Sequence, residues 1–156
     1  MDLYPALKLI HVLSGAVLFG TGLGIAFFMV WAHRSGRSVA IAEVSRIVVA
    51  ADFAFTATAV VIQPLTGFAL IRLQGYDLFE PWLVAAYGLY LLTGACWLPV
   101  VAIQMRMSRL ATQAATAGAP LPPAYHRLFR LWFVLGWPAF AAVVGLYGLM
   151  LFKPAF

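Results

Sequence analysis

Four long apolar stretches dominate this chain and limit what it can fold into. They occupy residues 5–32, 47–73, 81–104 and 130–152. Each stretch reaches the length of about 20 residues that an α-helix needs to cross the hydrocarbon core of a bilayer. Of the 156 residues, 64% are hydrophobic and only 10% are charged, so little chain is left for a soluble domain. The sequence therefore predicts one membrane domain.

The borders of the apolar stretches indicate where the helices begin and end. Pro5 and Pro81 stand near the starts of the first and third stretches, and proline suits the first turn of a helix. The segment 111–123 is small, polar and proline-rich, which predicts an exposed loop. Short connections favour antiparallel neighbours. We therefore predict an all-α, up-down four-helix membrane bundle, a single domain over residues 1–156 with helices over about 5–32, 44–73, 80–107 and 126–152.

Basic residues gather at two of the three connections. The first and third connections with their flanks carry Arg34, Arg37, Arg46, Arg106, Arg109, Arg127 and Arg130. Because cytoplasmic loops are enriched in basic residues, this pattern predicts that both termini lie outside, in a bacterial inner (cytoplasmic) membrane. The net charge of +5 then reflects membrane topology, and no nucleic-acid partner is predicted.

One histidine, His11, falls within the first apolar stretch. A titratable imidazole in hydrocarbon is costly, so it marks a functional-site hypothesis by default. On a helix, His11, Gly15 and Gly22 share one face, and glycines beside a ligating imidazole would let a flat macrocycle approach the backbone. The same glycines suit close helix packing, in which case His11 only hydrogen-bonds to a neighbouring helix. The spacing leaves both interpretations open.

The other candidate ligands follow from depth in the membrane. His33 lies 22 residues beyond His11, about 33 Å along a helix, so it is not a second axial ligand. Met150 lies toward the same side of the membrane as His11, and methionine is an axial haem ligand. A lysine there neutralises a haem propionate. The predicted cofactor-binding residues are His11, Lys8, Gly15, Gly22 and Met150, with His11 as the metal ligand; no catalytic residue is assigned and enzymatic activity is left open.

Three further polar residues lie inside the apolar stretches. Asp52 is costly in hydrocarbon, so we expect it to face the interior and to pair with a cation such as Arg106 or Arg130. Gln63 and Gln104 are expected to form hydrogen bonds between helices.

Several long motifs carry a family resemblance. The chain contains the segments HVLSGAVLFGTGLGIAF, QPLTGFAL, CWLPVVAIQMRM, LPPAYHRLFRLWFVLGWPAF and LMLFKP. In these segments it resembles an uncharacterised bacterial family of predicted small integral membrane proteins, a domain of unknown function. The chain also contains Leu7, Lys8 and His11, then Trp82–Leu83 and Lys153–Pro154. In these residues it is more distantly similar to the superfamily of the CopD copper-resistance membrane domain and the HemJ-type protoporphyrinogen oxidase. This resemblance implies haem b in a four-helix bundle with His11 as its ligand.

Three functions are consistent with these features. The leading hypothesis is an inner-membrane protein that binds b-type haem through His11 and serves a redox or tetrapyrrole-related role. The alternative is a non-catalytic membrane module that stabilises a larger complex or a homo-oligomer. The third is copper or small-solute transport, as the CopD-like resemblance implies. The lipid bilayer and a homo-oligomeric or membrane-complex partner are the expected partners.

Overall fold

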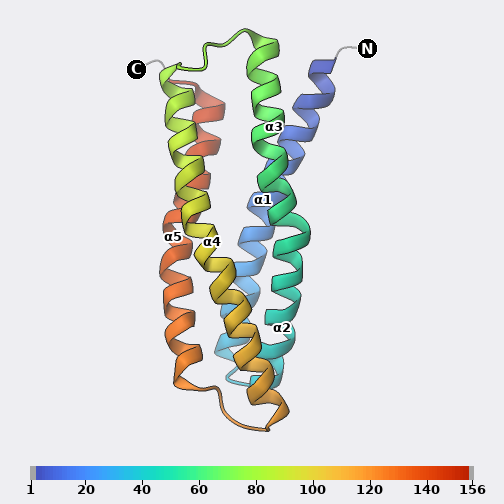
Figure 1. Ribbon diagram of the computed structural model, residues 1–156, viewed down its shortest axis with the longest axis vertical. Helices are drawn as coiled ribbons and strands as arrows, with labels where there is room; N and C mark the ends of the chain where they lie inside the picture. Colours follow the sequence, from blue (N-terminus) through green and yellow to red (C-terminus); the bar gives the residue numbers. More distant parts are fainter. Residues whose placement is uncertain (1–2, 155–156) are drawn as a thin grey trace.

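The chain folds into four long helical columns that run up and down the bundle (Figure 1). The computed structural model describes residues 3–154. Its helices are α1 (Leu3–Arg34), α2 (Ser38–Ala51), the π-helix η1 (Asp52–Thr56), α3 (Ala57–Gln74), α4 (Pro81–Thr116) and α5 (Pro123–Phe152). α2, η1 and α3 continue one another as a single column, and all four columns are long and apolar enough to cross a membrane. The described residues contain no strand. The predicted all-α four-helix membrane bundle is confirmed.

The two ends of the bundle differ in what they carry. Both ends of the chain and the connection between α3 and α4 lie at one end, which we call the terminal end (Figure 1). The connections from α1 to α2 and from α4 to α5 lie at the other, which we call the loop end. The predicted orientation, with the termini outside, stays a prediction.

Three helix ends at the loop end lie beyond their predicted positions. α2 begins at Ser38 and not near 44, α4 runs to Thr116 and not to 107, and α5 begins at Pro123 and not at 126. The predicted loop over 111–123 is therefore wrong for residues 111–116. These residues are half alanine, the best helix former, and the Thr112 and Thr116 hydroxyls donate to carbonyls one turn back. The polar residues mark the end of the apolar stretch, and α4 continues as a helix beyond that point.

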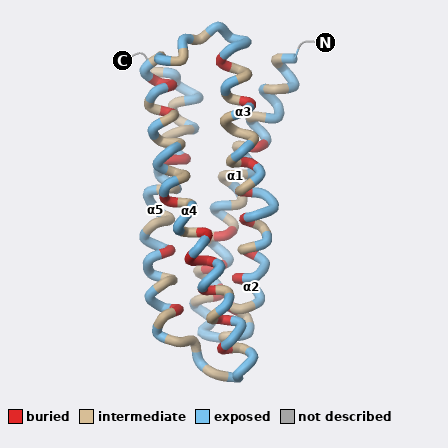
Figure 2. Tube along the Cα trace, viewed as in Figure 1, coloured by how far each residue is buried: buried red, intermediate tan, exposed pale blue. Residues whose placement is uncertain are grey.

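The apolar core lies mainly toward the loop end. Its largest cluster of buried residues includes Ile25, Met29, Ile41, Val48, Met107, Tyr125 and Trp132. Figure 2 shows the buried positions along the inner sides of the helices, with exposed positions facing outward. α4 packs along α5 and α2, and α1 packs along α3 and α2, whereas α1 touches α5 over a short stretch. The α1–α3 and α4–α5 pairs diverge toward the terminal end (Figure 1).

A proline inside α3 frees a carbonyl that a neighbouring helix then satisfies. Pro64 has no N–H, so the carbonyl of Val60, four residues earlier, lacks its usual helical partner. The Tyr90 hydroxyl of α4 donates to that carbonyl. Membrane helices tolerate proline where such a side chain replaces the lost hydrogen bond. This bond also joins α3 to α4.

Candidate functional site

His11 lies between α1 and α3 with its ring held by a threonine. Its Nδ1 lies 2.8 Å from Oγ1 of Thr66. The Thr66 hydroxyl donates its single hydrogen to the carbonyl of Ile62, at 2.7 Å. Thr66 must therefore accept from Nδ1–H, since a carbonyl only accepts and a hydroxyl has one hydrogen to give. A neutral imidazole protonated at Nδ1 carries a lone pair on Nε2.

The Nε2 atom of His11 is not enclosed by the protein. It has no hydrogen-bond partner among residues 3–154. In that same part of the chain, the fully buried polar side-chain atoms without a partner belong to His33, Thr56, Tyr87 and Tyr125. Because Nε2 is absent from that set, it is not fully buried within the bundle. The site thus offers one oriented nitrogen lone pair.

Gln63 fixes the backbone of α1 at the same level. Its amide nitrogen donates to the carbonyl of His11 and to the hydroxyl of Ser14, both at 2.8 Å. The predicted role of Gln63 as an interhelical hydrogen-bonder is confirmed. Together with Thr66, it sets both the rotation of α1 and the direction of the imidazole ring. We call His11, Ser14, Gln63 and Thr66 the His11 cluster.

The glycines of this region have different surroundings. A Cβ on Gly67 would lie 3.3 Å from Cε1 of His11, so the ring lies close against the α3 backbone. A Cβ on Gly15 would lie 3.0 Å from the amide nitrogen of Gln63 and 3.2 Å from the Tyr147 hydroxyl. Gly22 has open space around it, with nothing within 4 Å. Gly15 therefore serves close packing, and Gly22 leaves a bare patch of helix surface.

Met150 and Lys8 lie in the terminal half with His11. Gly15 lies beside Tyr147 of the antiparallel α5, so His11, one turn nearer the terminal end, is level with Met150. Met150 is 40% exposed. Lys8 is exposed, with its ammonium 5.8 Å from the centre of the Tyr4 ring. The two residues share the depth of His11 but are not packed against it in the way that Thr66 and Gly67 are.

A second polar network joins η1 to α4 and α5. Asp52 is 3% exposed. Its two carboxylate oxygens accept from the Trp97 indole at 3.1 Å and from the Gln104 amide at 2.9 Å. The Gln104 carbonyl oxygen accepts from the Trp132 indole at 2.8 Å. The interhelical role predicted for Gln104 is confirmed. We call these four residues the Asp52 network.

The predicted pairing of Asp52 with Arg106 or Arg130 is wrong. Both arginines are exposed on the outer surface of their helices. A guanidinium is costly in hydrocarbon and extends toward the interface when it can. Neutral N–H donors from Trp97 and Gln104 reach the carboxylate in place of an arginine.

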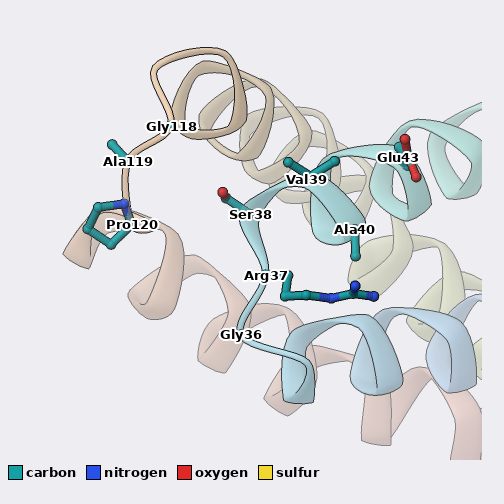
Figure 3. Close-up of a pocket in the computed structure, with 9 residues that line it drawn as sticks. All are labelled: Gly36, Arg37, Ser38, Val39, Ala40, Glu43, Gly118, Ala119 and Pro120. Atoms are coloured by element: carbon teal, nitrogen blue, oxygen red, sulfur yellow. The ribbon is translucent and has the colours of Figure 1, made fainter.

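A shallow hollow opens at the loop end, remote from His11. It forms where the turn before α2 approaches the turn after α4 (Figure 3). Its charged lining residues are Arg37 and Glu43. No histidine, cysteine or aromatic side chain contributes to its lining in the described chain, and it brings no ligand set together.

The comparisons with known proteins identify a family but no activity. Residues 5–154 match the family model described as "Predicted integral membrane protein (DUF2269)". No curated protein and no solved structure gives a significant match. The predicted similarity to an uncharacterised family is thus confirmed, and the more distant resemblance to CopD and HemJ stays a prediction. Because the match covers nearly the whole chain, this protein is an integral membrane protein of the DUF2269 family.

Proposed function

We propose that this membrane protein binds b-type haem through Nε2 of His11 and serves a redox or tetrapyrrole-related role. The observation that carries the proposal is the fixed tautomer of His11. Thr66 accepts the Nδ1–H bond while its own hydrogen goes to Ile62, which leaves the Nε2 lone pair free. Metal-ligating histidines characteristically donate their other ring N–H to a protein acceptor, which fixes both tautomer and orientation.

The surrounding residues fit a membrane haem site. Met150 offers a thioether at the depth of His11, and methionine is an axial haem ligand. The Lys8 ammonium lies toward the terminal end, where it would pair with a propionate. Gly22 leaves helix surface open to a flat ring. Haem in such a site supplies one-electron redox chemistry, and the apolar helices exclude water from it.

The proposal is tested by absorption spectroscopy of the purified protein expressed with excess haem. The wild type should give a reduced-minus-oxidised spectrum typical of b-type haem, and His11→Ala should lose it. Thr66→Val keeps the side-chain volume but removes the acceptor, and loss of such a partner weakens metal affinity by about 10- to 100-fold. His126→Ala, an exposed histidine in α5 near the loop end, is the matched control and should leave the spectrum unchanged.

Two results would contradict haem binding at His11. One is a colourless wild type despite excess haem, and the other is an unchanged spectrum in His11→Ala. Either would favour the alternative function, a non-catalytic membrane module that stabilises a larger complex or a homo-oligomer. The observation behind that alternative is that the His11 cluster already joins α1 to α3 through its own hydrogen bonds.

Copper or small-solute transport remains the third hypothesis. Thioethers are suitable ligands for copper(I). Met29 and Met107 are fully buried in the loop-end core, whereas Met105 and Met150 are exposed. Among the described methionines, this division does not favour a continuous row of thioethers through the bilayer.

A further inference from the structure

A buried carboxylate without a counter-ion lies near the middle of the column formed by α2, η1 and α3. The partners of Asp52 are the neutral N–H groups of Trp97 and Gln104. The arginines of the surrounding elements, Arg46, Arg106 and Arg130, are exposed. The buried thiol of Cys96 precedes Trp97 on α4, and α1 and α3 carry their charged and titratable side chains toward their ends. An ionised carboxylate in this position is therefore not compensated by the described residues.

The negative charge of a buried carboxylate must be compensated, because burying it costs free energy. Moving an ion from water into the protein interior costs several kcal/mol even after relaxation. Two neutral N–H donors orient a carboxylate and stabilise it in part, but they add no opposite charge. A small cation bound at the carboxylate removes the excess charge without any movement of the helices.

A second buried oxygen lies one turn from Asp52. Thr56 is 6% exposed, and its hydroxyl has no hydrogen-bond partner. Threonines elsewhere in the helices donate to the carbonyl four residues back, as Thr58 and Thr93 do. For Thr56 that carbonyl belongs to Asp52, in η1, and this bond is not formed. The buried Thr56 hydroxyl is therefore free, on the same inward side as Asp52.

We propose that Asp52 and Thr56 form a membrane-embedded binding site for an alkali-metal ion. The carboxylate supplies the charge and Thr56 Oγ1 supplies a neutral oxygen. Trp97 and Gln104 hold the carboxylate in place from α4. π-Helical turns within α-helices occur frequently at functional sites. The site lies away from the His11 cluster and needs no haem, so its test is independent of the proposed function.

Infrared difference spectroscopy tests this site on the full chain in detergent. In a buffer without alkali-metal ions and at constant pH, adding NaCl or KCl should shift a carboxylate stretching band of the wild type. Asp52→Asn should lack that shift, and Asp77→Asn, which removes an exposed carboxylate in the connection before α4, should keep it. Should Asp52→Asn fail to fold, Asp52→Glu identifies the band by moving its frequency.

Thermal unfolding gives a second readout of the same site. At least one of the two salts should raise the melting temperature of the wild type, but not that of Asp52→Asn. Thr56→Val should shift the midpoint of the response, whereas Thr58→Val, at an exposed threonine, should not. Carboxylate bands and a melting temperature that neither salt changes would overturn the proposal.

Discussion

Gln104→Leu should lower the free energy of unfolding by about 2–6 kcal/mol. Gln104 is 2% exposed and connects Asp52 to Trp132, donating to one at 2.9 Å and accepting from the other at 2.8 Å. Leucine keeps a similar volume but has no polar atom. The substitution therefore leaves one carboxylate oxygen and one indole N–H buried without a partner, and each such group costs about 1–3 kcal/mol.

Reversible unfolding in mixed micelles with increasing denaturing detergent measures this loss. Gln113→Leu is the matched control, because Gln113 is exposed on the same helix, and it should change stability little. The double variant Asp52→Leu with Gln104→Leu should lose less stability than the two single variants lose in total, since the carboxylate that needed Gln104 is gone. A loss near about 0.6 kcal/mol, the average for interhelical hydrogen bonds in membranes, would contradict this prediction. The Asp52 network would then stabilise the fold no more than an ordinary interhelical hydrogen bond does.

The membrane-spanning helices could be predicted from the sequence because few backbone structures are stable in a bilayer. A backbone in hydrocarbon must satisfy its own hydrogen bonds, so an apolar stretch of sufficient length becomes a helix. That constraint ends at the membrane surface. Residues 111–116 are polar enough to read as a loop, yet their alanines and threonines continue α4 to Thr116. The helix ends therefore depended on local propensity, which hydropathy does not report.

The candidate site was predictable in part. A polar residue within an apolar stretch can be recognised from the sequence, because it is costly in hydrocarbon, but the residue that contacts it cannot. His11 stands out by its position alone, but its contact with Thr66 was missed because the register between α1 and α3 is a tertiary property. A signal was present, since Gln63, Thr66 and Gly67 are spaced i, i+3 and i+4 and share one side of a helix. The predicted partner of Asp52 was wrong for a related reason. A buried carboxylate in the sequence suggests a cation, but a neutral donor such as the Trp97 indole can take that place.

Gly15 and Gly22 are equivalent in the sequence pattern, and the structure separates them. Gly15→Leu should lower the free energy of unfolding by about 3 kcal/mol. Even the first carbon of the new side chain would lie 3.0 Å from the Gln63 amide and 3.2 Å from the Tyr147 hydroxyl. The larger leucine therefore forces α1 away from its neighbours and breaks the bonds from Gln63 to His11 and Ser14.

Gly22→Leu is the matched substitution on the same helix, and it should leave the fold intact or stabilise it by up to about 1 kcal/mol. Nothing lies within 4 Å of a Cβ there, and leucine is a much better helix former than glycine. Unfolding in mixed micelles compares the two variants, and equal losses would contradict the packing role of Gly15. The absorption spectrum adds a second readout. If a haem ring lies against Gly22, this variant loses haem while its fold remains stable, which a purely structural role of the glycine would not produce.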